Sequence, residues 1–179
     1  KVLRFPGDHE GESFGAITAE AVARVEITDV ERRRVFAMAV SSTDGRDRGR
    51  PSSWSAQVDR LACDYEGQGA TRRLFVLCAG NTDDNNAWAA YPHSLSTSSV
   101  HDPGQAWNAL TVGAYSDLTT ISAKAPAYKP IAIAGGLSPY TTTSATWQAD
   151  WPFKPDIVLE GGNVAIEPSG FTSSMDSLS

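Results

Sequence analysis

The chain is short of cysteine, and the little it has gives no disulfide framework. Its 179 residues include two cysteines, Cys63 and Cys78. Both lie in apolar stretches, so we expect two buried free thiols. This cysteine usage favours a cytoplasmic origin without fixing the localisation.

Positive charge is also scarce. Lysine and arginine number 15 against 21 acidic residues, which gives a net charge of −6. The one basic cluster, Arg46, Arg48 and Arg50, is interrupted by Asp44 and Asp47, and we expect a solvated loop there. The charge balance argues against a nucleic-acid partner.

Long apolar runs and metal-ligand patterns are missing as well. No apolar stretch approaches the length of a membrane span, and no signal peptide is visible, so no membrane partner is expected. No spacing of His, Cys, Asp and Glu suits a zinc or EF-hand site, so neither a metal nor a cofactor is expected. The hydrophobic content of 41% suffices for one core, and we treat residues 1–179 as a single domain.

Two helices are predicted from apolar periodicity. Apolar residues recur at helical spacing from Phe14 to Val25. A second helix opens at Pro51, and Gly67 and Gly69 are expected to end it. Its apolar positions fall on one helical face: Trp54, Val58, Leu61, Ala62 and Tyr65.

The strands are predicted from unbroken apolar runs, which are typical of parallel strands buried on both faces. The two longest runs cover residues 35–40 and 74–81, and a helix separates them, as in a right-handed βαβ unit. Three further runs should continue the sheet: 110–114, 131–134 and 157–159. Loops are expected over 137–150. The predicted class is α/β with a mostly parallel sheet flanked by helices.

Asn81 ends the run that starts at Leu74, and the polar segment 82–86 follows it. Ligands of open α/β sheets bind beyond the carboxyl ends of the strands, where a carboxamide can donate to an oxyanion. Alternatively, Asn81 caps the next helix or adopts a left-handed turn. The local sequence alone favours this second interpretation.

Four segments in order resemble the subtilisin-like serine peptidases, and the match is strongest over residues 33–165. They are Met38-Ala39-Val40-Ser41-Ser42, Cys78-Ala79-Gly80-Asn81, Asn108-Ala109-Leu110-Thr111-Val112-Gly113-Ala114 and Lys154-Pro155-Asp156-Ile157-Val158. The tryptophan-rich insertions and the long 83–103 region suggest a divergent bacterial member. The resemblance implies an incomplete three-layer subtilisin-like fold.

The resemblance also implies roles for individual residues. Asn81 would be the side-chain donor of the oxyanion hole. Ala39, Val40, Ser41 and Gly80 would bind a polypeptide substrate, the first three by adding it as an extended strand.

The catalytic triad of such an enzyme is not evident. Neither an Asp-Thr/Ser-Gly nor a His-Gly-Thr stretch occurs, and His9, His93 and His101 are expected to be surface or satisfied loop histidines. Ser174 before Met175 imitates the nucleophile motif, but the neighbouring sequence disagrees with it. Residues 166–179 are expected to lead toward a nucleophile outside this chain.

Two functional hypotheses follow. The chain is expected to be the central part of a serine endopeptidase, inactive alone, because Lys1 and Ser179 fall at unusual places for domain ends. The alternative is a complete non-catalytic module that binds peptide or protein. In the first case, exposed apolar surface and an unpaired sheet edge are expected.

Overall fold

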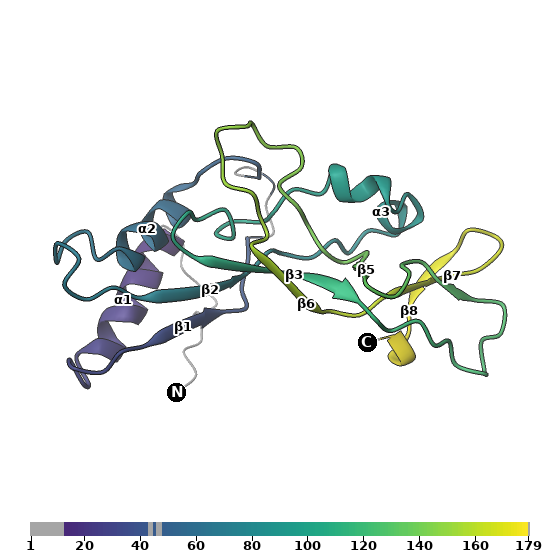
Figure 1. Cartoon of the computed structure of the whole chain (residues 1–179), viewed down its shortest axis with the longest axis horizontal. Helices are drawn as coiled ribbons and strands as arrows, with labels where there is room; N and C mark the ends of the chain where they lie inside the picture. Colours follow the sequence, from purple (N-terminus) through teal and green to yellow (C-terminus); the bar gives the residue numbers. More distant parts are fainter. Residues whose placement is uncertain (1–12, 43–44, 46–47, 179) are drawn as a thin grey trace.

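A computed structural model describes residues 13–42, 45 and 48–178. Figure 1 shows two helices beside one end of a sheet and a smaller sheet toward the other end. The elements are, in chain order, α1 (Phe14–Glu26), β1 (Val35–Met38), α2 (Ser53–Ala62), β2 (Leu74–Cys78), α3 (Asn85–Ala89), the 3-10 helix η1 (His93–Ser96), β3 (Leu110–Ser116), β4 (Lys129–Pro130), β5 (Gly136–Leu137), β6 (Ile157–Glu160), β7 (Val164–Ile166), β8 (Thr172–Ser174) and the 3-10 helix η2 (Asp176–Leu178).

Serine side chains start both long helices. The Ser13 side chain accepts the Ala16 N–H at the beginning of α1. Ser52 caps α2, and its side chain and that of Ser55 each accept the other's backbone N–H in a capping box. Both predicted helices are therefore confirmed, with starts that the sequence indicated.

The end of α2 differs from the prediction. The helix stops at Ala62, and Cys63 is its C-cap. Asp64 then takes a left-handed conformation with φ of 54°, which breaks the helix before Gly67 is reached. Tyr65 is consequently 67% exposed and outside the helical face. The prediction of a buried Cys63 was also wrong, since this thiol is exposed, whereas Cys78 is half-buried.

The main sheet is mostly parallel, as predicted. Its order is β1-β2-β3-β5, and β6 also pairs with β3. Strands β1, β2, β3 and β6 run parallel, and only the short β5 is antiparallel. The β1–α2–β2 unit is thus a parallel crossover, and the α/β class is confirmed.

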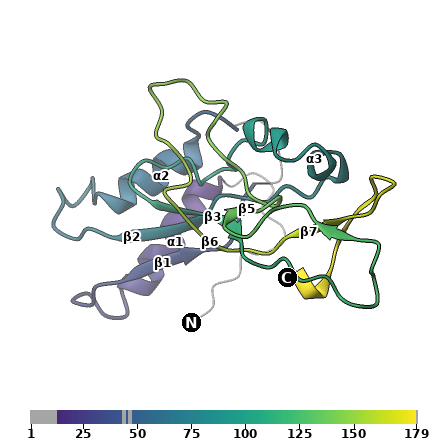
Figure 2. The ribbon, with the colours of Figure 1, turned by 45° about the vertical axis from the view of Figure 1, so that its right-hand side comes forward.

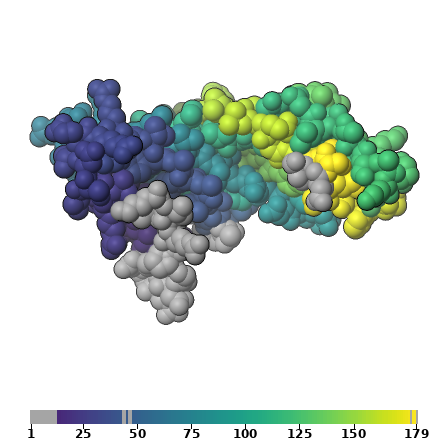
Figure 3. Space-filling view, turned by 90° about the horizontal axis from the view of Figure 1, so that it is seen from below, coloured from purple at the N-terminus to yellow at the C-terminus, as the bar shows by residue number. Residues whose placement is uncertain are grey.

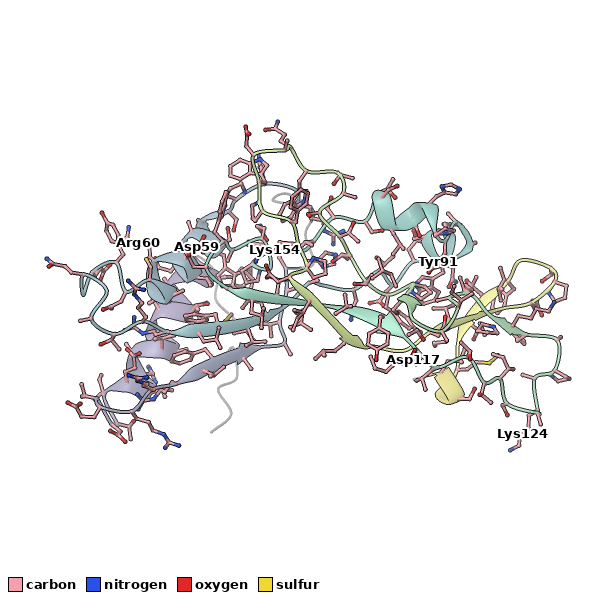
Figure 4. All side chains as sticks on the ribbon, in the orientation of Figure 1. Asp59, Arg60, Tyr91, Asp117, Lys124 and Lys154 are labelled. Carbon is pink, nitrogen blue, oxygen red and sulfur yellow. The ribbon has the colours of Figure 1, made fainter. Side chains whose placement is uncertain are left out.

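Two sets of contacts fix the start of β3, one exposed and one centred on the buried Lys154 side chain. The Asp59 carboxylate on α2 accepts the N–H groups of Trp107 and Asn108 at 3.1 and 2.6 Å. The Lys154 ammonium donates to the Ala109 carbonyl at 2.8 Å and pairs with Asp156 at 2.7 Å. Figure 4 labels Asp59 and Lys154 near the beginning of β3. The central strand is therefore tied to α2 and to the segment that enters β6.

The predicted strand at residues 131–134 was wrong. The chain turns there between β4 and β5, with the Gly136 N–H bonded to the Ile133 carbonyl and Gly135 at φ of 76°. The buried Asn163 side chain accepts the Ala132 N–H and donates to the Ala132 carbonyl. These bonds replace strand pairing, and Ile133 is 78% exposed. The neighbouring strands form a separate antiparallel sheet in the order β4-β7-β8.

One face of the main sheet is buried under the helices. The core that joins α1, α2 and the sheet includes Val22, Val58, Phe75 and Leu77. Phe75 and Leu77 are 0% and 1% exposed and point to the same face of β2 because side chains alternate along a strand. Phe36 stacks on Phe75 with ring centroids 5.1 Å apart.

The opposite face is open within the described residues. Leu74 pairs with Val35 across β1 and β2, and they are 46% and 62% exposed. Ile157 and Leu159 on β6 are 43% and 58% exposed on the same side. The prediction that the two longest runs are buried on both faces was therefore wrong for this chain, because α1 and α2 cover one side only.

Strand β1 forms an edge of the sheet in the described part of the chain, as expected. An open groove of about 790 Å³ follows this edge between β1 and α1 and extends to Ala39 and Val40. Figure 3 shows an elongated body with the α1–β1 region at one end and the C-terminal third at the other. In both ribbon views the loop that leads into β6 projects from this body (Figure 2). No helix among the described residues has the length and apolar character to cross a bilayer.

Candidate active site

The ends of β1 and β2 bring two predicted substrate-binding segments together. The strands are parallel, and Met38 lies opposite Leu77. Residues 39–41 and 79–81 therefore emerge side by side at the same edge of the sheet, which is the usual ligand-binding edge of open α/β sheets. Ala39 and Val40 are exposed there, and Ser41 and Gly80 are half-buried.

Asn81 is held in place by its backbone. It forms an antiparallel bridge with Thr141, and the next N–H, that of Thr82, donates to the Tyr140 carbonyl at 2.9 Å. The Asn81 side chain is exposed, and its carboxamide has no hydrogen-bond partner among the described residues. A fixed backbone thus presents a free amide donor to solvent.

The alternative interpretation of Asn81 was wrong. The N-cap of α3 is Asp84, whose side chain accepts the Asn86 N–H at 3.0 Å. Nor does Asn81 take the left-handed conformation, which at this turn belongs to Gly80 with φ of 95°. Glycine adopts that conformation without steric cost.

Ala79, the residue before Gly80, is held by hydrogen bonds at both its N–H and its carbonyl. The Ala79 N–H donates to the Val112 carbonyl at 2.9 Å. Its carbonyl accepts the His101 N–H at 2.8 Å and the Thr142 hydroxyl at 2.7 Å. Because Ala79 and Thr142 are buried, these bonds fix the segment that carries Gly80 and Asn81.

The segment after β1 is fixed through the same connection. The Ser42 N–H donates to the Asp102 carbonyl at 2.8 Å. The Asp102 carboxylate accepts the Ser52 hydroxyl at the start of α2. Residues 101–102 therefore bridge the two strand ends that flank the candidate site.

His101 lies in a loop, as predicted, but the extent of its burial was not foreseen from the sequence. It is only 7% exposed, so it is not a surface histidine. Its pKa is lowered to about 4, mainly by burial and also by the positive charge of Arg48, while the negative charge of Asp83 opposes the change. Its ring lies against Gly80, a tertiary contact that no local sequence signal announces.

The other candidates are not joined to one another by hydrogen bonds among the described residues. Ser174 ends β8 and is exposed, and its side chain interacts with the Tyr140 phenol. His93 begins η1, and no hydrogen bond between a histidine and Ser174 occurs among the described residues. His9 lies outside the described residues, as do Asp44, Arg46 and Asp47 of the predicted basic loop, whereas Arg48 and Arg50 of that loop are exposed. The described residues therefore show no hydrogen-bonded Ser-His-Asp arrangement.

The chemistry available at the site is that of an exposed amide donor at the carboxyl ends of two parallel strands. Burial raises the pKa of Cys78, which leaves its thiol protonated and a poor nucleophile. No group of three or more potential metal ligands occurs in the described part of the chain. The polar group that is free to donate a hydrogen bond at the carboxyl end of β2 is the Asn81 carboxamide.

Comparison with known proteins places this geometry in a family. No curated protein matches the chain. The family model described as the subtilase family, Peptidase_S8, matches residues 1–179. This match spans the whole chain, and the parallel sheet agrees with it. The chain therefore belongs to the subtilase family of serine peptidases.

Proposed function

We propose that the protein is a serine endopeptidase in which Asn81 donates a hydrogen bond to the oxyanion. The observation that carries the proposal is the free, exposed carboxamide of Asn81 at the end of β2, on a backbone fixed by the Thr141 bridge. A donor held in advance stabilises the charge that develops on the scissile carbonyl oxygen without further reorganisation.

The substrate groove would run along the neighbouring segments. Ala39, Val40 and Ser41 continue from an edge strand, so an extended polypeptide can add to them through backbone hydrogen bonds. The open groove beside β1 reaches Ala39 and Val40, which supports this path. Gly80 would allow the substrate backbone to approach closely because it has no side chain.

The triad would be supplied by parts of the protein outside this chain. The described residues hold no hydrogen-bonded Ser-His-Asp set, and the sheet leaves apolar side chains such as Leu74 and Leu159 open to solvent. Such a surface is expected where further structure covers the sheet. The chain alone would then bind substrate weakly and cleave nothing.

A second candidate function rests on the same lack of a triad among the described residues. A subtilisin-like sheet without a nucleophile could bind peptides or proteins at its open edge. The two functions differ in reactivity, because only the peptidase has a serine that a fluorophosphonate can modify.

The test is fluorophosphonate labelling and peptide cleavage by the full-length protein. Asn81→Ala is expected to lower kcat by about 10²–10³ while labelling remains detectable. Asn86→Ala is a matched control because Asn86 is an exposed asparagine on α3 and should leave kcat unchanged. A full-length protein that is neither labelled nor active would contradict the peptidase and favour the binding module.

A further inference from the structure

Two tryptophans, Trp107 and Trp151, form an exposed aromatic corner near the start of β3. Their ring centroids lie 6.4 Å apart, and the ring planes meet at 72°. Trp107 is 54% exposed, although burying an indole removes a large apolar area from water. Because the two rings meet edge to face and do not stack, they leave ring surface open to a third group.

The backbone that carries each ring of the aromatic corner is anchored. The Trp107 N–H donates to the Asp59 carboxylate on α2 at 3.1 Å. Trp151 lies in a loop whose two ends, Ser144 and Lys154, are joined by two hydrogen bonds of 2.8 Å. This loop projects from the body of the molecule (Figure 1). The fold therefore holds the two rings together without any ligand.

The aromatic corner is separate from the candidate active site. Trp107 lies before β3, which begins at Leu110. Asn81 forms a bridge with Thr141, whose hydroxyl accepts the Ala114 N–H farther along the same strand. From Leu110 to Ala114 the chain rises by roughly 13 Å. A group bound at the aromatic corner would therefore lie away from a peptide bond at Asn81.

Two carboxylates lie beside the aromatic corner. Asp59 contacts the Trp107 backbone, and its side chain is not fully buried. Asp150 precedes Trp151 and is exposed, and it makes no hydrogen bond or ion pair with the described residues. Negative charge is thus available next to both rings.

The basic residues next to these positions in the chain are already paired. The Lys154 side chain is buried in an ion pair with Asp156. Arg60 pairs with Glu66, and its guanidinium lies 5.0 Å from the centroid of the Tyr65 ring. Neither cation compensates Asp150, so the surface around the aromatic corner is complementary to a positive group.

We propose that the aromatic corner is a docking site for an arginine side chain presented by a partner polypeptide. A guanidinium is attracted to the face of an indole, and its planar shape lets it stack on a ring while its N–H groups donate to a carboxylate. An apolar partner would instead remove water from Asp59 and Asp150 without pairing them, which is costly. The inference is independent of the proposed peptidase function, because it requires no group at Asn81.

The test is calorimetric titration of the full-length protein, and of the 179-residue chain, with a short glycine-serine peptide that carries several arginines. One control peptide has citrulline in place of arginine, which keeps the shape and removes the charge. A second has lysine, which keeps the charge and removes the planar group. The arginine peptide should bind most tightly. Trp151→Ala and Trp107→Ala should each raise its Kd by at least about threefold.

Matched variants separate the aromatic corner from general attraction of a cation to an acidic protein. Phe171→Ala removes a ring that is equally exposed, at 56%, on the β7–β8 hairpin and should leave the Kd unchanged. Asp150→Asn should raise the Kd by about twofold, whereas Asp29→Asn, at another exposed position, should not change it. Both acid variants alter the net charge equally, so a difference between them reports the position of the charge.

Three results would overturn the inference. The first is equal binding of the arginine peptide and either control peptide. The second is a Kd that Trp107→Ala and Trp151→Ala leave unchanged. The third is binding by the 179-residue chain that the full-length protein lacks, because the protein itself would then cover the aromatic corner. None of these results bears on the peptidase, which fluorophosphonate labelling tests separately.

Discussion

The two faces of the main sheet differ sharply although the same strands form them. On the face under α1 and α2, Phe75 and Leu77 are almost completely buried. On the other face, Leu74 and Leu159 are 46% and 58% exposed. Both sets are large apolar side chains, so the difference lies in what covers them. Apolar runs of this kind are typical of strands covered on both faces, but in the described residues the helices α1 and α2 cover one face only.

The open face of the sheet does not take part in holding the candidate site in place. The segment 79–81 is anchored by β3, by the loop at Thr142 and by His101. None of these contacts involves the open face. If the proposed function holds, we expect the oxyanion donor and the substrate-binding segments to form in this chain alone, and catalysis to require further structure.

The strongest way to test the comparison is to shorten one side chain on each face. Phe75→Ala should lower the free energy of unfolding by about 3–5 kcal/mol, because it leaves a cavity in the core beside Phe36. Leu74→Ala, its neighbour on the open face, should cost less than about 1 kcal/mol. Chemical denaturation of the two variants measures both values. An equal loss of unfolding free energy in the two variants would show that both faces of the sheet are buried to the same extent.

A smaller effect is expected from the ion pairs that attach the helices to the covered side. Arg73 precedes β2 and pairs with Glu26 of α1 and with Asp64 after α2, and its side chain is only 13% exposed. Arg73→Met should cost about 1–3 kcal/mol, because two partly buried carboxylates lose a charged partner. The control Arg60→Met breaks the exposed pair with Glu66 and should cost less than about 1 kcal/mol.

The Asp64 carboxylate, which pairs with Arg73, makes the stability difference between wild type and Arg73→Met depend on pH. Hydrogen bonds from the Thr71 N–H and from Arg73 hold the pKa of Asp64 below its ordinary value of 3.8. A lowered pKa in the folded state means that the unfolded state binds more protons, so this contribution is present above pH 3.8 and is lost as the pH falls through the folded value. Acid titration should therefore bring wild type and Arg73→Met closer together. A constant difference would contradict the assignment.

Much of the fold could be predicted because periodicity encodes it. The helix at Phe14–Glu26 and the parallel strands β1, β2, β3 and β6 follow from apolar spacing alone. The run at residues 131–134 has the same composition but turns, because the Asn163 side chain takes its backbone hydrogen bonds. A partner 31 residues away in the sequence leaves no mark on local periodicity.

The candidate site was predictable to a different degree. The segments that carry Asn81 and Ala39 lie at strand ends, and parallel strands place their carboxyl ends at one edge, so their proximity could be foreseen. The burial of His101 could not, because it depends on the close approach of a loop to Gly80. The exposure of Cys63 was missed for a similar reason, since the helix ends at a left-handed residue that its sequence does not reveal.

The smallest expected effect comes from charging the open face. Leu74→Lys should change the free energy of unfolding of the 179-residue chain by no more than about 0.5 kcal/mol, because a lysine there can extend into water. It should also reduce self-association in light scattering, because an exposed apolar patch is an aggregation site. In a longer protein that covers this face, the same substitution would bury a charge and cost several kcal/mol. The free energy of unfolding of Leu74→Lys, measured in both chains, therefore tells whether the open face stays in contact with solvent or is covered by further structure. A small loss in both chains would contradict a covered face.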